Sequence, residues 1–163
     1  MRLFLSIAPK HREHVMDYIA PRLKQKLGVD LIAEVVGSVP MVERIAAQMP
    51  NPRISIARWD VLIGLAACEQ GLGALIDLER APPNASGVMP AEGSPSVNGG
   101  LSMVKGGPCE AAAYEFLDLY YSDEFQAMRM REGGASPSKT AWNLLSQAER
   151  QALGSPPTTS QTR

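Results

Sequence analysis

Two adjacent tyrosines, Tyr120 and Tyr121, are the first residues to suggest a chemical site, because paired phenolates can bind ferric iron. They fall in a stretch whose apolar spacing predicts a helix. Adjacent residues on a helix point in different directions, so one ring should pack inward and the other should lie at the surface. We therefore interpret the pair as part of the helix packing rather than as an iron site.

His11 and His14 have the i, i+3 spacing with which two imidazoles on one helix can share a metal ion. A stable site needs further ligands, and the nearby sequence offers only Glu13 or Asp17. We interpret the histidines as part of a solvated helix face. The sequence predicts no metal site and no cofactor.

Nucleophilic chemistry is not indicated either. Cys68 is followed by Glu69 and has no evident base partner to activate its thiol. The stretch Gly71-Leu72-Gly73 is too short for a phosphate loop and lies at an expected helix end. No general acid–base pair stands out, so we expect no catalytic residues and a protein that is not an enzyme. Cys68 and Cys109 are too few for a disulfide scaffold; two free thiols are favoured over a disulfide between them.

The composition narrows the range of partners. Sixteen Lys and Arg against 17 Asp and Glu give a net charge of −1, which argues against binding to nucleic acid. No apolar run approaches 18 residues, so we expect no membrane insertion. The N-terminal run that ends at Ala8 lacks a cleavage site, and a first strand explains it better than a signal peptide.

Strands and helices alternate three times in the first half of the chain, which predicts a parallel sheet with helices on its faces. The expected helices start near Lys10, Pro40 and Ala66. Pro21 should kink or break the first, and Gly28 should cap its end. The apolar and β-branched runs predict strands at Leu3–Ala8, Asp30–Val36 and Asp60–Leu65.

The second half begins after a proline-rich connector, residues 81–98. A strand at Leu101–Lys105 and a helix at Cys109–Tyr121 should complete the sheet and cover one of its faces. Ser122 should cap a further helix, and Ser146 with Glu149 should form a capping box for the last one. The polar tail, residues 155–163, is expected to be disordered.

Ligands of parallel α/β sheets sit beyond the carboxyl ends of the strands. Here those ends are expected at Ile7–Lys10, Gly37–Val39 and Gly64–Ala67. The second is also a helix N-terminus with free backbone N–H groups, which suits an anion. Alternatively, Ser38 only caps that helix.

Three blocks of the sequence, in this order, resemble the extracellular solute-binding proteins of ABC transporters, in the branch of iron(III), thiamine, polyamine and 2-aminoethylphosphonate binders. The first resembles the family's helix tail, Gly-Val, strand, Gly-Ser and helix. The second is similar to its third strand and Asp…Ala-Pro exit, and the third to its returning segment. The blocks are LKQKLGVDLIAEVVGSVPMVERIAAQ, WDVLIGLAACEQGLGALIDLERAP and PAEGSPSVNGGLSMVKGGPCEAAAYEFLDLYYSDEFQ.

The resemblance implies a fold of the type II periplasmic-binding-protein kind. Family members have two lobes, and the segment for the second lobe is not found between the second and third blocks. We therefore expect a single three-layer α/β lobe over residues 1–154, with halves 1–80 and 99–154. Its sheet should be mostly parallel, with Leu101–Lys105 as one antiparallel strand beside the third strand. The family's metal-binding tyrosines lie mostly in the absent lobe, so an iron site does not transfer.

What transfers is one wall of a ligand cleft. The resemblance therefore predicts a module that binds a small polar or anionic ligand, either weakly or at a dimer interface. The alternative is a homo-oligomeric interaction protein without a transport ligand. Either should associate through the exposed cleft face. The resemblance implies a periplasmic location, and Met1 as the native start would imply a cytoplasmic one. The expected ligand-binding residues are Ser6, Ala8, Pro9, Gly37, Ser38, Val39, Gly64 and Ala66.

Overall fold

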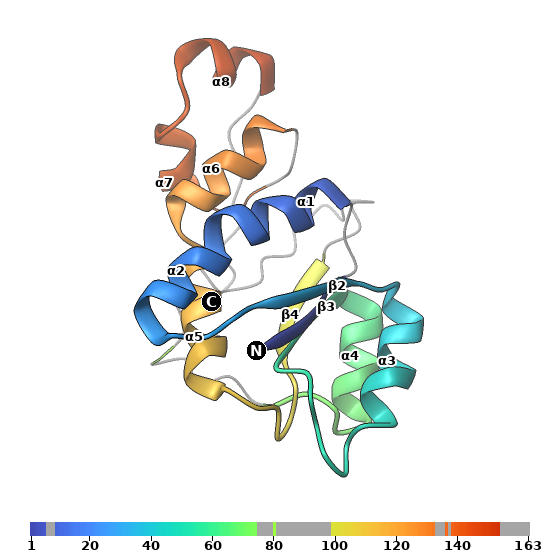
Figure 1. Ribbon diagram of the computed structural model, residues 1–163. Coiled ribbons are helices and arrows are strands. Elements are labelled where there is room, and N and C mark those ends of the chain that lie inside the picture. The colour runs from blue at the N-terminus through green and yellow to red at the C-terminus, as the bar shows by residue number, and fades with distance from the viewer. Residues whose placement is uncertain (6–8, 75–79, 81–98, 133–135, 137, 154–163) are drawn as a thin grey trace. The chain divides into compact units, whose positions relative to one another are not determined.

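The computed structural model describes residues 1–5, 9–74, 80, 99–132, 136 and 138–153 (Figure 1). The chain forms two units, one made of Met1–Ala81 with Val97–Phe116 and the other of Pro82–Ser96 with Leu117–Arg163. The expected connector at 81–98 and the expected disordered tail at 155–163 lie outside the described residues.

A four-stranded sheet organises the first unit, in the order β2-β1-β3-β4. The central strand β1 pairs in parallel with β2 and with β3, and β4 runs antiparallel to β3. This confirms the predicted α/β class and the predicted antiparallel strand beside the third strand. The strands are β1 (Arg2–Leu5), β2 (Ile32–Val35), β3 (Ile56–Asp60) and β4 (Gly99–Met103).

The predicted third strand was wrong. Residues Asp60–Leu65 do not form a strand: β3 ends at Asp60, and Val61–Glu69 is the helix α4. A short apolar run fits a buried strand or a helix equally well by hydrophobicity alone. Asp60, with an extended backbone (φ −67°, ψ 140°), is the N-cap of α4, a position at which aspartate is favoured. Leu62 and Leu65 are exposed while Gly64 and Ala67 are buried, which is helical and not alternating spacing.

Other boundaries also differ from the prediction. β2 is shorter than expected and β1 begins one residue earlier, at Arg2; the rest of the predicted first strand, residues 6–8, lies outside the described residues. The last strand is β4 at Gly99–Met103, two residues before the predicted Leu101–Lys105, and Val104 forms an isolated bridge with Gly73. Helix α3 (Ser38–Ala46), which follows β2, begins before the predicted Pro40. Its N-cap is Gly37 and not Ser38.

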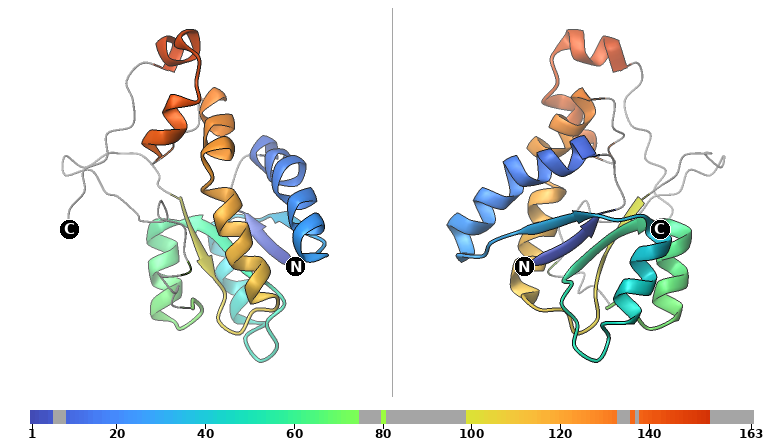
Figure 2. Two further views of the ribbon diagram at one scale, coloured as in Figure 1. Left: turned by 90° about the vertical axis from the view of Figure 1, so that its left-hand side faces the viewer. Right: turned by 45° about the vertical axis from the view of Figure 1, so that its right-hand side comes forward.

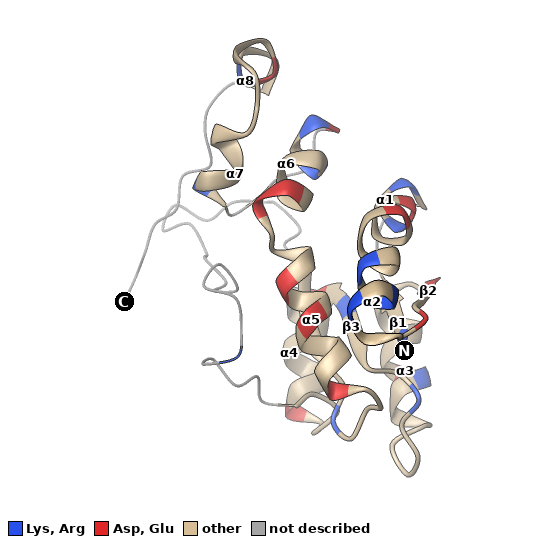
Figure 3. Cartoon of the chain, turned by 60° about the vertical axis from the view of Figure 1, so that its left-hand side comes forward, with Lys and Arg blue, Asp and Glu red and all other residues tan. Residues whose placement is uncertain are grey.

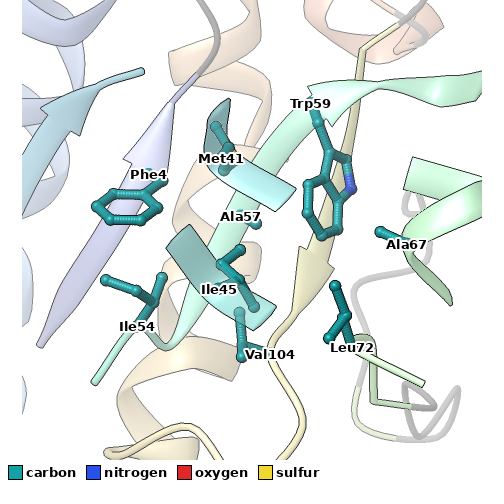
Figure 4. Close-up of a cluster of buried hydrophobic side chains, with 9 residues drawn as sticks. All are labelled: Phe4, Met41, Ile45, Ile54, Ala57, Trp59, Ala67, Leu72 and Val104. Atoms are coloured by element: carbon teal, nitrogen blue, oxygen red, sulfur yellow. The ribbon is translucent and has the colours of Figure 1, made fainter. Parts of the chain in front are cut away.

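Helices α3 and α4 cover one face of the sheet, and the hydrophobic core lies between them and the strands (Figure 4). Trp59 on β3 is its largest member at 1% exposure, and its indole Nε1 donates a hydrogen bond to Ser102 Oγ on β4 at 3.0 Å. Truncating a buried tryptophan costs about 3–5 kcal/mol, so this ring is a main source of stability. The buried cluster comprises Phe4, Met41, Ile45, Ile54, Ala57, Trp59, Ala67, Leu72 and Val104.

A continuous helical segment lies on the opposite side of the sheet from α3 and α4 (Figure 2). It runs through α1 (Pro9–His14), the π-helical turn η1 (Val15–Ile19) and α2 (Ala20–Leu27), and Gly28 ends it in the left-handed conformation (φ 67°) as predicted. The expected disruption at Pro21 takes the form of η1. Since proline has no N–H to donate, the wider turn just before it lets the helix continue without that hydrogen bond.

Helix α5 (Glu110–Tyr120) begins in the first unit and ends in the second, close to the predicted Cys109–Tyr121. In the first unit its residues Ala112, Ala113 and Phe116 are buried. An ion pair between Lys26 Nζ on α2 and Glu115 Oε2 on α5, at 2.6 Å, joins oppositely charged faces of these two helices (Figure 3).

The second unit contains the helices α6 (Asp123–Arg131), α7 (Lys139–Asn143) and α8 (Gln147–Leu153). Ser122 caps α6 and accepts a hydrogen bond from Phe125 N, as predicted. The predicted capping box is confirmed: Ser146 N donates to Glu149 Oε2 at 2.6 Å and Glu149 N donates to Ser146 Oγ at 3.3 Å. Helix α7 was not predicted, because five residues are too few for a recognisable apolar period.

Candidate functional site: the carboxyl edge of the sheet

The carboxyl ends of β2 and β3 lead directly into α3 and α4 at one edge of the sheet, which we call the carboxyl edge. Ser38 and Asp60 join these two junctions. Ser38 Oγ donates to Asp60 Oδ2 at 3.0 Å, and Asp60 N donates to Ser38 Oγ at 3.1 Å. A reciprocal pair of this kind fixes the start of α3 against the start of α4, so the edge is held in one geometry.

The eight expected site residues do not share one environment. Ser6 and Ala8 lie outside the described residues, and Pro9 is the first residue of α1. Gly37 caps α3, Ser38 follows it with its side chain buried, and Val39 is 58% exposed. The structure thus keeps Gly37, Ser38 and Val39 at the carboxyl edge.

Gly64 and Ala66 were expected at the end of a strand and lie inside α4 instead. Gly64 is buried against Trp59: a Cβ at this position would lie 2.7 Å from both Cδ1 and Nε1 of the indole. The glycine is there for close packing of helix against strand. Ala66 lies on the exposed side of the helix.

The predicted role of Ser38 in anion binding meets a chemical obstacle. A hydroxyl has a single proton to donate, and Ser38 gives it to the Asp60 carboxylate. That carboxylate is itself an anion placed at the start of two helices, where the helix dipoles favour negative charge. Asp60, expected to open a strand, therefore already places a negative charge at these helix starts, although neither N-cap makes a side-chain capping hydrogen bond.

Arg58 is a charged residue of this region that was not predicted as a site residue. It lies on β3 next to the end of that strand and is partly buried. Its guanidinium reaches Gly99, the first residue of β4. The signal in the sequence is an arginine inside the otherwise apolar run from Ile56 to Trp59, since arginine is rarely buried without a specific reason.

The other residues considered for chemistry, the tyrosine pair and the two cysteines, do not form a site. Tyr120 is buried against Phe125, with ring centroids 5.1 Å apart, and Tyr121 is half-buried, as the helix geometry predicted. Cys68 and Cys109 are free and exposed. Within the described residues there is no group of three or more His, Cys, Asp or Glu side chains placed to hold a metal ion. No helix in this part of the chain has the length and apolarity needed to cross a membrane.

Comparison with known proteins gives a partial structural likeness. No model of a protein family matches the sequence, and no curated protein matches it. The periplasmic binding protein AfuA from Actinobacillus pleuropneumoniae, solved with exogenous fructose-6-phosphate bound, is similar at 23% identity and a TM-score of 0.43. Iron-bound HitA from Pseudomonas aeruginosa is similar at 14% identity and a TM-score of 0.42.

The likeness is confined to part of each chain. It covers 55% of the present chain and 26% of the AfuA chain, and 53% and 28% for HitA. The present chain thus matches about a quarter of the length of these proteins.

Proposed function

We propose that this chain is a binding module, a one-lobed relative of transporter solute-binding proteins that holds a small polar or anionic ligand at the carboxyl edge. The observation that carries the proposal is the Ser38–Asp60 pair, which fixes the starts of α3 and α4 side by side at the end of the parallel strands. Pre-organised backbone N–H groups at such an edge are the usual place for ligands of α/β sheets.

The affinity should be modest. A ligand pocket normally buries most of its ligand's surface, and one edge of one sheet supplies a single wall. A second copy of the chain that faces the edge would supply the other. We propose that the module acts in the periplasm, as solute-binding proteins of this kind do, and that it binds its ligand without chemical change.

A thermal-shift screen with phosphonates, polyamines, carboxylates and metal ions tests the proposal. A ligand that binds only the folded state must raise its stability by mass action. We expect one chemical class to raise Tm by more than about 2 °C at 100-fold excess over its Kd. If no class of compound raised Tm, the proposed binding function would be ruled out.

A second candidate function is a homo-oligomeric interaction protein without a transport ligand. The observation that favours it is an exposed apolar surface on α4, where Leu62 is 79% and Leu65 is 58% exposed, one helical turn apart. Ala66 lies beside them on the same exposed side. We call Leu62, Leu65 and Ala66 the α4 stripe, and propose that a second copy of the chain covers it.

A further inference from the structure

We propose that Arg12 protects the open edge of the sheet. It holds the carbonyl group of Ala33 on β2, and so prevents a second copy of the chain from adding its own β2 at this place. The inference concerns association of the chain through the sheet, and it is independent of the ligand proposed for the carboxyl edge.

β2 is an edge strand. It stands at one end of the order β2-β1-β3-β4, so within the described residues only β1 pairs with it. Ile32 N donates to Met1 O at 2.9 Å, toward the β1 side. Backbone groups alternate in direction along a strand, so those of Ala33 and Val35 point away from β1. A row of outward N–H and C=O groups is a template on which another strand can pair.

Arg12 occupies one of these outward groups. Its Nε, on α1, donates to Ala33 O at 2.9 Å, and the two residues are 21 positions apart in the chain. Arg12 itself is exposed, so the hydrophobic core does not require its side chain, whereas Ala33 is only 5% exposed. A strand that paired with this edge would need the same carbonyl oxygen, and it would first have to displace a charged donor.

The exposed side chains of β2 explain why the edge needs protection. Ile32 is 48% and Val35 is 46% exposed, and both are β-branched residues that favour strands. The charge of Glu34 is offset by ion pairs with Arg2 at 3.5 Å and Arg44 at 3.0 Å, which weakens its repulsion of another strand. Natural edge strands commonly carry a cation against unwanted pairing, and Arg12 supplies one here from a neighbouring helix.

A second copy of the chain is the partner that fits this edge. Two copies related by a twofold axis would bring their β2 strands together antiparallel, and each would offer the other the same backbone groups and the same apolar side chains. β2 has only four residues, so the pairing should be weak and should need a high protein concentration.

The test compares variants of a Leu62→Glu, Leu65→Glu parent, so that association through the α4 stripe does not interfere. Light scattering at high protein concentration gives the mass. Arg12→Ala should raise the mass toward that of a dimer, about twofold over the parent. The matched control is Arg22→Ala, which removes another exposed arginine. Its Nη1 donates to Tyr18 O at 2.8 Å, four residues earlier in the same helical segment, so the control should keep the mass of the parent.

Val35→Lys separates edge pairing from a loss of folding. Val35 is half-exposed, so the replacement should be tolerated, and it places a charge directly on the edge. Added to Arg12→Ala, it should return the mass to that of the parent, whereas aggregation caused by unfolding would persist. In Arg12→Ala alone, hydrogen exchange of the Val35 amide should slow as the protein concentration rises, because pairing covers that N–H group.

Three results would overturn the inference. The first is an Arg12→Ala variant with the mass of its parent, and the second is association of Arg22→Ala to the same extent. The third is association of Arg12→Ala that Val35→Lys does not reverse. Each of these leaves the proposed ligand binding in place, because the thermal-shift screen tests that function separately.

Discussion

Gly64 is a position where one methyl group should matter, because the Trp59 indole occupies the space that a Cβ needs. The ring is 1% exposed and held by its hydrogen bond to Ser102, so it has little freedom to move away. We predict that Gly64→Ala destabilises the protein by about 1–3 kcal/mol, the usual cost of overpacking. Urea unfolding measures the change, with Gly100→Ala as the control. Equal midpoints for the two variants would mean that the helix and strand separate at little cost.

The Ser38–Asp60 pair is the second residue-scale test. Ser38→Ala removes the acceptor of Asp60 N and the donor to Asp60 Oδ2, and leaves a half-buried carboxylate without that partner. We expect a loss of about 1–3 kcal/mol. A double-mutant cycle with Asp60→Ala should show coupling, because the double variant no longer contains an orphaned partner. Strictly additive effects would argue against direct coupling between the two residues.

The environments of Tyr120 and Ser122 were predicted correctly, because each follows from the residue's position in or next to a helix. Prediction was less complete for residues whose partners are distant in the chain. Ser38 was considered as a cap or a ligand-binding residue, and the structure bonds it to Asp60, 22 positions away. The reach of Arg58 to Gly99 depends on the pairing of β3 with β4, which local spacing does not reveal.

Among the elements, α8 should have a stability that depends on pH, because its capping box contains the titratable side chain of Glu149. The hydrogen bond that Glu149 accepts from the backbone N–H of Ser146 is the main reason why its pKa lies below the ordinary 4.5, with the Ser146 hydroxyl and Arg131 adding to the effect. A pKa lowered by folding means a contribution to stability that is present above about pH 4.5 and is lost as pH falls through the lower folded value.

We therefore predict that α8 loosens on acidification below pH 4.5. The Ser146 amide resonance, followed by NMR against pH, should titrate with a midpoint below that value. Glu149→Gln should abolish the titration, and Ser146→Ala should move the Glu149 midpoint up toward its ordinary pKa. A midpoint in the wild type at or above 4.5 would contradict the capping box as its cause.

Elements with a strong local signal were predicted nearly in place, as α5, α6 and α8 show. The error at the third strand has a specific physical origin. The run Val61–Leu65 is apolar enough for a buried strand, whereas the real strand, Ile56–Asp60, contains the charged residues Arg58 and Asp60. As a result, Gly64 and Ala66 were expected in a turn at the end of a strand, whereas they lie inside α4.

At the scale of the whole molecule, the parallel sheet was predicted from the alternation of strands and helices, whereas the strand order β2-β1-β3-β4 was not predicted. The antiparallel β4 was predicted from the family resemblance and not from periodicity. What local spacing does not determine is which surfaces remain uncovered once the sheet is built. The α4 stripe is such a surface, and its two leucines were expected in a buried strand.

The α4 stripe leads to a prediction about assembly. Two leucines a turn apart, one of them 79% exposed, place apolar side chains in water on a helix whose nine residues carry a single charge, Glu69. Burial of such a surface against a second copy is favourable at about 25 cal/mol per Å² of apolar area. We predict a dimer by light scattering at tens of micromolar. Leu62→Glu with Leu65→Glu should give a monomer, because a dimer would bring like charges together where apolar contact was lost.

The control variant is Leu144→Glu, which changes another exposed leucine (48% exposed) on the second unit and should leave the dimer intact. The double variant needs a circular dichroism spectrum that matches the wild type, since both leucines are exposed and their replacement should not unfold α4. A wild-type protein that is monodisperse and monomeric at these concentrations would contradict the predicted dimer. The carboxyl edge would then have to bind its ligand with one wall alone.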